Sequence, residues 1–329
     1  MLDLVGEPGT MGPVTGERRQ LHTSEWLEHF ARAGYPDATP LAAGAEGSVY
    51  RLGNDTVAKV WQRRRVSELA RLQRFYADVA AHPLPFATPE IARVMQVGDV
   101  AVTFERELPG TPLQDRLAVS DSELDPAAVA AVVGVLRALA EVPASPAMVD
   151  MPVLDETLPL WAGADSFLGA LGALLGRRVA RFGGLLRARV PDFDTRYAQL
   201  LVALAAVEPV PASVVHGDLF GENILVDDAS RPVAVLDFGF LTTAGDPRLD
   251  AAITAAVMNM YGPHAHVITD ALTRKFAVEL GCPTQTLLVY QGVYAVATAN
   301  AFTADGTDGH FGWCVAQLSR PDLLEALCP

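Results

Sequence analysis

The feature that most constrains the fold of this 329-residue chain is a short β-rich segment, residues 213–240, set between long helical stretches. Apolar runs at 214–215 and 224–226 bracket a polar loop with the sequence His-Gly-Asp-Leu-Phe-Gly-Glu-Asn. A turn at 227–232 and another apolar run then lead into Asp-Phe-Gly at 237–239. β-branched residues favour strands, whereas Gly, Asp and Asn favour loops. The pattern predicts strands that hold a polar loop in one place.

The polar residues of this segment suit phosphoryl transfer, in which the protein positions a hydroxyl and holds metal ions against phosphates. Asp218 is predicted to be the base that accepts the hydroxyl proton. Asn223 and Asp237 offer an amide oxygen and a carboxylate to Mg²⁺. His216 is predicted to brace the loop. Each residue alone would pass for an ordinary turn residue, but their order between two apolar strands favours the catalytic interpretation.

The chain before this segment predicts an antiparallel sheet with two helices. A helix starts near Thr23 or Ser24 and ends near Gly34, and a second covers residues 65–80. Short β-type segments separated by Gly-rich or Asn-Asp turns are predicted at 41–43, 48–52, 56–61, 91–97 and 100–104.

From Leu108-Pro109-Gly110 onwards the sequence is mostly helical. Ala- and Leu-rich runs lie at 122–141, 165–189 and 194–207, and helices resume after residue 250. We therefore expect an α+β protein with a flexible tail at 1–22, a nucleotide-binding lobe at 23–108 and a helical lobe at 109–329 that carries the catalytic loop and the substrate site.

The segment His-Gly-Asp-x-x-x-x-Asn, followed by Asp-Phe-Gly and by Gly-Asp-Pro-Arg-Leu-Asp at 245–250, resembles the aminoglycoside phosphotransferase family of antibiotic kinases. The resemblance implies a two-lobed protein-kinase-like fold, with an antiparallel-sheet N-lobe and a mainly helical C-lobe. It also implies the base role for Asp218, magnesium ligation by Asn223 and Asp237, and ATP or GTP as phosphoryl donor.

Lys59 is one of only two lysines, the other being Lys275, among 25 basic residues. It lies on the third predicted strand, where kinase-like folds place the lysine that contacts the α- and β-phosphates. The alternative is an exposed strand lysine. Glu68 is the predicted ion-pair partner on the following helix, although a surface glutamate is an alternative there.

The first hairpin carries Gly44, Gly47 and Ser48, where residues with small side chains allow backbone to approach phosphates. The three-glycine loop of protein kinases is absent, and a plain turn is the alternative. Residues 104–113 resemble the hinge of the family, which implies that Arg106 and Leu108 offer backbone groups to the nucleotide base.

Several other functions remain open at this stage. A protein kinase is disfavoured because no Ala-Pro-Glu follows Asp-Phe-Gly and Gly217 replaces the arginine expected beside the catalytic Asp. The acceptor of an antibiotic kinase could be an aminoglycoside, a macrolide, or a peptide or nucleoside antibiotic. A metabolite kinase for choline, homoserine or a sugar shares the same motifs, and an inactive nucleotide-binding scaffold is a further alternative.

A formal net charge of −14 argues against nucleic acid as a partner, since its binders need a basic face. No apolar run reaches the roughly 20 residues that a membrane helix needs, and residues 1–20 do not resemble a signal peptide. The three cysteines are widely separated and indicate neither disulfides nor zinc. The expected location is the cytoplasm.

The acceptor site is expected in the C-terminal part of the chain. Acids outnumber bases there by eight to four between residues 240 and 329, which favours a cationic acceptor. The residues predicted to line it are Asp305, Asp308, Trp313, Tyr261 and Asn300. A solvated acidic loop is the alternative for the two aspartates, and the apolar helices at 165–207 would equally suit a lipophilic acceptor.

Overall fold

The computed structural model describes residues 22–44, 46–62, 64–116, 119–120, 123–262 and 264–328. The chain forms two compact units. The first runs to Leu69 and includes Ile91–Glu107, and the second comprises Ala70–Glu90 and the chain from Leu108 onwards. Apart from His22, the predicted tail lies outside the described residues, and the predicted lobe boundaries stay a prediction.

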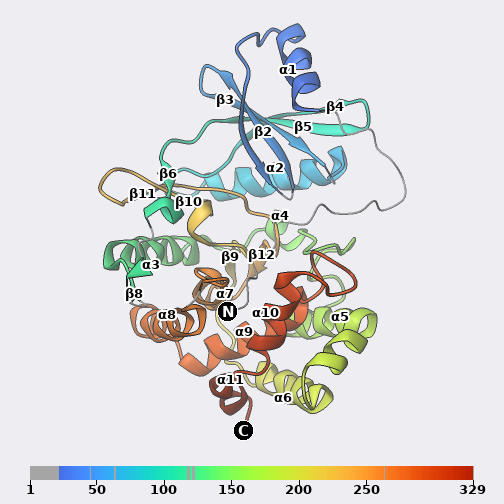
Figure 1. Ribbon diagram of the computed structural model, residues 1–329, viewed down its shortest axis with the longest axis vertical. Coiled ribbons are helices and arrows are strands. Elements are labelled where there is room, and N and C mark those ends of the chain that lie inside the picture. Colours follow the sequence, from blue (N-terminus) through green and yellow to red (C-terminus); the bar gives the residue numbers. More distant parts are fainter. Residues whose placement is uncertain are drawn as a thin grey trace, which may run out of the picture. The chain divides into compact units, whose positions relative to one another are not determined.

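The first unit is an antiparallel sheet of five strands in the order β1-β2-β3-β5-β4, with one helix packed against it (Figure 1). The helix α1 begins one residue after His22, whose backbone N–H donates to the Glu25 carboxylate at 2.7 Å. The elements are α1 (Thr23–Arg32), β1 (Thr39–Gly44), β2 (Gly47–Gly53), β3 (Thr56–Trp61), β4 (Ile91–Val97) and β5 (Val100–Arg106).

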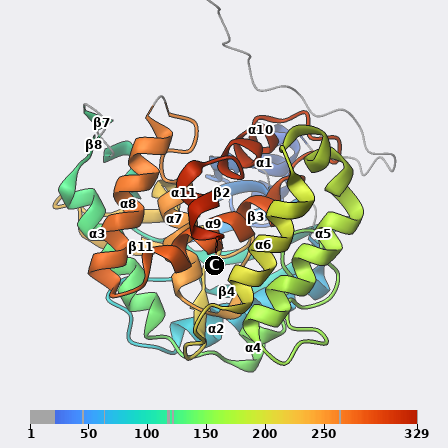
Figure 2. The same ribbon diagram turned by 90° about the horizontal axis from the view of Figure 1, so that it is seen from below.

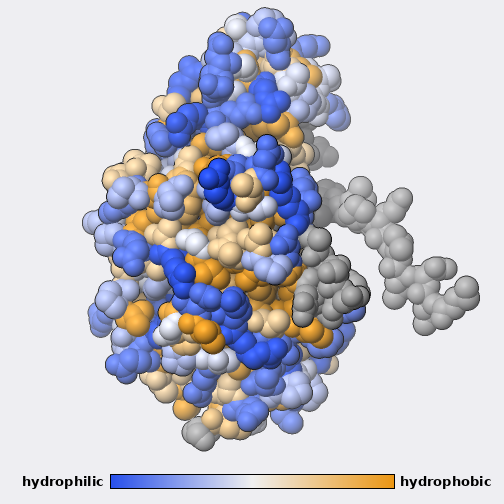
Figure 3. All heavy atoms as spheres, turned by 90° about the vertical axis from the view of Figure 1, so that its left-hand side faces the viewer, coloured by the Kyte–Doolittle hydropathy of each residue, from blue (hydrophilic) through white to orange (hydrophobic). Residues whose placement is uncertain are grey.

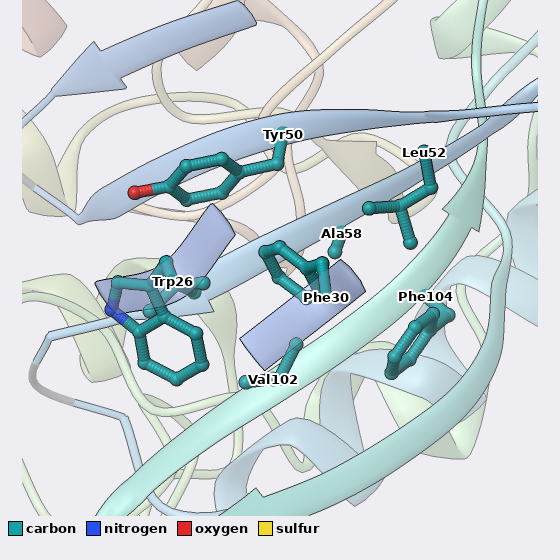
Figure 4. Packing of buried hydrophobic residues seen from close by; sticks show 8 residues of the cluster. Trp26, Phe30, Tyr50, Leu52, Ala58, Val102 and Phe104 are labelled. Carbon is teal, nitrogen blue, oxygen red and sulfur yellow. The ribbon is translucent and has the colours of Figure 1, made fainter. Parts of the chain in front are cut away.

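The core of this unit lies between α1 and one face of the sheet (Figure 4). Trp26 and Phe30 are four residues apart on α1 and therefore share a face. Phe30 packs 5.2 Å from the ring of Tyr50 on β2, measured between ring centroids. Alternate residues of a strand point to the same side, which is why Tyr50 and Leu52 both enter this core.

The helix α2 (Val66–Ala80) begins in the first unit and continues in the second. Its later turns pack with the catalytic segment: the rings of Phe75 and Tyr76 lie 5.4 and 6.0 Å from Phe238. Beyond the helix, the backbone N–H of Ala87 donates to Val233 at 2.9 Å. These contacts explain why residues 70–90 belong to the second unit.

The β-rich segment of the second unit folds into two small antiparallel pairs around the polar loop. β9 (Ser213–Val215), which precedes the loop, pairs with β12 (Thr243–Gly245). β10 (Ile224–Val226), which follows it, pairs with β11 (Pro232–Val235) and β6 (Thr111–Pro112). Both ends of the loop are thus fixed by strands, as the apolar runs predicted. A further short pair joins β7 (Val119–Ser120) to β8 (Glu123–Leu124).

The helices of the second unit surround α9, which is apolar all round and buried from Thr286 to Thr298. Figure 2 shows α9 with α5 and α6 on one side and α7 and α8 on the other. The helices are α3 (Pro126–Ala140), α4 (Pro146–Val149), α5 (Phe167–Arg189), α6 (Phe193–Ala205), α7 (Arg248–Val257), α8 (Ala265–Leu280), α9 (Thr284–Thr298), α10 (Gly309–Gln317) and α11 (Pro321–Ala326), with 3₁₀ turns at Leu113–Arg116 and Gly221–Asn223.

The surface shown in Figure 3 mixes hydrophilic and hydrophobic residues. Within the described ranges, no helix is both long and apolar enough to cross a membrane. The architecture is α+β, with the sheet in one unit and most helices in the other.

Candidate active site

A buried carboxylate holds the polar loop after β9 by hydrogen bonds to its backbone. Asp250, in the first turn of α7, is 2% exposed and accepts the backbone N–H of His216 on Oδ2 and that of Gly217 on Oδ1, both at 2.7 Å. Burial raises the pKa of Asp250 to about 7, although the two N–H bonds oppose the shift by favouring the carboxylate. The backbone immediately before Asp218 is therefore fixed by a buried side chain from 32 residues further along.

Gly217 is required at its position for two reasons. Its φ of +77° lies in the left-handed region, and a Cβ there would lie 2.3 Å from the carbonyl carbon of Leu241. The next residue, Thr242, donates its hydroxyl to the backbone oxygen of His216 at 2.5 Å. The chain just after Asp-Phe-Gly thus packs directly on the loop that carries Asp218.

His216 is a neutral brace rather than a base. Its Nε2–H donates to the backbone oxygen of Leu236 at 2.8 Å, and its Nδ1 accepts the backbone N–H of Asp218 at 3.2 Å. Complete burial lowers the pKa of His216 to about 4. Its ring lies 4.4 Å from that of Phe238. The imidazole therefore joins the polar loop to the Asp-Phe-Gly segment, a contact consistent with the predicted bracing of the loop.

Asp218 is half-buried, and the loop beyond it is closed by Asn223. The side-chain Nδ2 of Asn223 donates to the backbone oxygen of Asp218 at 2.8 Å, which directs the amide oxygen away from this contact. Asp237 is exposed and has a φ of +51°, an uncommon backbone conformation for a residue other than glycine.

The donor set at the predicted metal site is one amide oxygen and one carboxylate. Such hard oxygen ligands suit Mg²⁺, which binds through one or two protein groups together with phosphate oxygens and water. Asn223 and Asp237 fit this requirement in chemistry, since the Asn223 amide nitrogen is already engaged with Asp218. The described residues contain no larger group, of three or more His, Cys, Asp or Glu side chains, placed to share a metal ion.

In the first unit, Lys59 is 8% exposed on β3, opposite Val49 on β2 and Thr103 on β5. Its Nζ lies 3.2 Å from a carboxylate oxygen of Glu46. Glu68, the predicted partner, accepts the backbone N–H of Arg65 at 2.9 Å and so closes the first turn of α2. A carboxylate that lies beside Lys59 is that of Glu46, which sequence reasoning missed because it lies in the hairpin rather than on the helix.

The predicted phosphate loop occupies the β1–β2 hairpin. A Cβ at Gly47 would lie 1.9 Å from the backbone oxygen of Val60, so packing of the neighbouring strand already requires glycine there. At Gly44 a Cβ would have no atom of the described residues within 4 Å. Ser48 is half-buried and pairs with Val60. Gly44 is therefore the glycine that sheet packing does not explain.

The predicted hinge residues follow the end of β5. Arg106 is the last residue of β5 and is exposed, whereas Leu108, two positions on, is half-buried. Between them, the backbone N–H of Glu107 donates to Asp55 at 2.7 Å. The Glu107 carboxylate also receives both Nε and Nη2 of Arg51, the shortest contact being 2.5 Å. These contacts fix the connector where the first unit ends.

The residues predicted to line an acceptor site divide into two groups. The aspartates shape the loop between α9 and α10: Asp308 accepts the N–H of Phe311 at 2.8 Å as the N-cap of α10, and Asp305 accepts the N–H and the hydroxyl of Thr307. The others are Trp313 and Asn300, which are 8% and 6% exposed, and Tyr261, which is 67% exposed.

A α+β fold with an antiparallel sheet, and a catalytic loop that leads into Asp-Phe-Gly, define a kinase-like phosphotransferase. Residues 37–277 match the model of the phosphotransferase enzyme family, and the chain belongs to this family. The predicted resemblance is thereby confirmed. No curated protein matches the chain significantly.

Solved structures of antibiotic kinases share the fold at low sequence identity. A macrolide 2'-phosphotransferase from Brachybacterium faecium is 20% identical, with a TM-score of 0.57 over 90% of this chain and 98% of that one. An aminoglycoside phosphotransferase from Streptomyces rimosus is 19% identical, with a TM-score of 0.53 over 83% and 97%. The GDP complex of an aminoglycoside 2'-phosphotransferase is 15% identical, with a TM-score of 0.60 over 92% and 98%. The kinase-like fold class predicted from the sequence is correct.

Proposed function

We propose that this phosphotransferase moves the γ-phosphoryl group of ATP or GTP onto a hydroxyl group of an antibiotic. The observation that carries the proposal is the loop at residues 216–223, in which Asp250, His216, Thr242 and Asn223 all hold the backbone on either side of Asp218. A base that must meet a hydroxyl in a defined position needs this kind of support, since small misplacements greatly slow the reaction.

In the proposed reaction the acceptor oxygen forms a bond to the γ-phosphorus. The bond from that phosphorus to the β-phosphate oxygen breaks, and the nucleoside diphosphate leaves. The hydroxyl proton passes to the carboxylate of Asp218, as general base catalysis requires. His216 does not compete for this proton, because its pKa is about 4 and both ring nitrogens are engaged.

Asn223 and Asp237 are the residues proposed to hold magnesium. When bound, the ion would offset the charge of the phosphates. The contribution of the chain is to keep both oxygen ligands next to the catalytic loop: Asn223 through its bond to Asp218, and Asp237 through the packed Phe238 beside it.

The nucleotide is proposed to contact residues of the first unit. Lys59 would meet the α- and β-phosphates, with Glu46 taking the place proposed for Glu68 beside it. Gly44, Gly47 and Ser48 would lie against the phosphates, and the backbone of Arg106 and Leu108 against the base. Two structures of similar fold contain a nucleotide and an antibiotic: an aminoglycoside phosphotransferase with ADP and streptomycin, and another with GDP and kanamycin. Because such donors are intracellular nucleotides, we place the reaction in the cytoplasm.

The test is nucleotide turnover with a panel of antibiotics, measured for the parent protein and for Asp218→Asn. We expect the variant to lose at least about 100-fold in kcat, the usual contribution of a general base, while its Kd for nucleotide is unchanged. Asp228→Asn is the matched control, since its side chain is fully exposed on the β10–β11 turn. An Asp218→Asn protein as active as the control, or the absence of stimulation by any acceptor, contradicts the proposal and favours a nucleotide-binding scaffold.

A further inference from the structure

An aromatic surface lies beside the catalytic loop in the second unit. Phe240, just after Asp-Phe-Gly, stacks on Phe302 with ring centroids 5.7 Å apart and planes 12° apart. Phe240 is half-buried and Phe302 is 47% exposed. Aromatic side chains contribute large apolar contact areas at binding surfaces. We call Phe240 and Phe302 the aromatic wall.

The aromatic wall adjoins the loop that carries Asp218 through the residues that follow Phe240. Phe240 is covalently followed by Leu241, whose backbone rests against Gly217, and by Thr242, which bonds to His216. On the other side, Phe302 lies 5.0 Å from the ring of His310, centroid to centroid. The wall therefore adjoins the loop on which the proposed base sits.

Tyr294 of α9 packs against aromatic rings next to the wall. Its ring lies 6.2 Å from His310 and 6.0 Å from Trp313. Burial raises its pKa well above the usual value, and the charge of Asp218 adds to that shift. Tyr261, which is 67% exposed, lies near Tyr294, and partial burial together with the nearby Cys314 and Asp308 raises the pKa of Tyr261.

The buried groups near the wall that can form hydrogen bonds are uncharged. His310 stacks on Trp313 at 5.5 Å, and burial lowers its pKa to about 4. The hydroxyl of Thr298 donates its proton to the backbone oxygen of Tyr294. The Nε2–H of His310 therefore donates to the Thr298 oxygen at 2.9 Å, and the Nδ1 of the neutral ring carries no proton and can only accept. Within the described part of the chain, this Nδ1, the Nε1–H of Trp313 and the Oδ1 of Asn300 are buried without hydrogen-bond partners.

The acidic groups nearby are engaged in the loop itself. Asp308 caps α10 and receives the hydroxyl of Thr303, and Asp305 closes a turn with Thr307. Within this loop Asp308 accepts hydrogen bonds through both oxygens and Asp305 through Oδ1. The side chains that the wall does present are aromatic.

We propose that the aromatic wall is the acceptor subsite, and that the acceptor is a hydroxyl-bearing macrocyclic or polycyclic compound with a wide apolar face, not a polycation. The inference rests on the proposed kinase function. The apolar face stacks on Phe302 and Phe240, next to the loop that carries Asp218. The proposed apolar acceptor differs from the cationic acceptor that the excess of acidic residues between 240 and 329 suggested.

The test compares the macrolide erythromycin with the polycation kanamycin as acceptors, by following nucleoside diphosphate release. We expect kcat/KM to be at least about 100-fold higher for erythromycin. Phe302→Ala should raise the KM for erythromycin about tenfold with kcat nearly unchanged, because stacking and apolar contact contribute to binding. Val278→Ala, at an 80% exposed apolar position on α8, is the control and should leave both constants unchanged.

Two further measurements keep the outcomes distinct. If kanamycin is the better acceptor, or if Phe302→Ala leaves the KM for erythromycin unchanged, the inference is wrong while the kinase function stands. If neither acceptor stimulates turnover in a protein that binds nucleotide, the proposed function fails first. The thermal midpoint of Phe302→Ala, expected to match that of Val278→Ala, separates lost contact from lost folding.

Discussion

Replacing Gly217 by alanine tests the claim that the loop is fixed against Leu241. Two free-energy costs to the folded state add. A non-glycine residue at φ +77° costs roughly 1–2 kcal/mol. A Cβ placed 2.3 Å from a backbone carbon makes the backbone shift, which costs roughly 1–3 kcal/mol. The expected total is about 2–5 kcal/mol in the free energy of unfolding. For a unit of this size that lowers the thermal midpoint by about 2–4 °C per kcal/mol.

Gly281→Ala is the matched control. Gly281 ends α8 with a φ of +63°. A Cβ there would have no atom of the described residues within 4 Å, so only the conformational cost of about 1 kcal/mol applies. Urea unfolding and scanning calorimetry measure both variants. Because Asp218 follows Gly217, a shift of about 1 Å should also lower kcat by about 100-fold in Gly217→Ala alone. Equal destabilisation of the two variants, with kcat retained, would refute the reasoning.

The remaining predictions concern buried polar groups. Asp250→Asn turns an amide N–H₂ towards a backbone N–H, which leaves a buried donor unpaired and lowers the free energy of unfolding by about 1–3 kcal/mol. Because burial raises the pKa of Asp250 to about 7, its stabilising contribution is full below its unfolded pKa and is lost as pH rises through 7. The stability gap between parent and variant should therefore be widest at about pH 4, near the unfolded pKa of an aspartate, and shrink as the pH rises to about 7 in urea titrations. A gap that widens with pH contradicts the assignment. Trp313→Phe removes an N–H without a partner, whereas Trp161→Phe removes one that donates to the backbone oxygen of Ala244 at 2.8 Å. Trp161→Phe should cost about 1–3 kcal/mol more by calorimetry, and equal losses would mean that the Trp313 N–H is paired in solution.

The contiguous part of the site could be predicted from the sequence because its geometry is local. Strand-forming runs on both sides define where the loop begins and ends, and residues 216–223 fall into one turn between β9 and β10. The family and the fold class followed from the same segment. Most of the five-stranded sheet was also predictable, since β1-β2, β2-β3 and β4-β5 are joined by short hairpins whose turn residues are visible in the chain.

The parts that sequence reasoning missed depend on packing between distant residues. Asp250 had been noticed only within a motif, and its position beneath the loop depends on how α7 docks. A carboxylate beside Lys59 comes from Glu46 in the hairpin, whereas Glu68 accepts the backbone N–H of Arg65 at the start of α2. His310, Tyr294 and Phe302 carried no recognisable motif, because their contacts join α9, α10 and the loop between them.

The contacts of His216 and Asp250 together decide which group of the loop serves as base. A neutral imidazole with a pKa of about 4, whose Nε2–H and Nδ1 are both engaged, cannot take a proton near neutral pH. Asp250 is buried beneath the backbone and its two oxygens already accept N–H groups, so it meets no acceptor hydroxyl. Both residues instead fix the backbone from which the half-buried Asp218 projects. These contacts support the proposal that Asp218 accepts the proton, because its two titratable neighbours are engaged in holding the backbone.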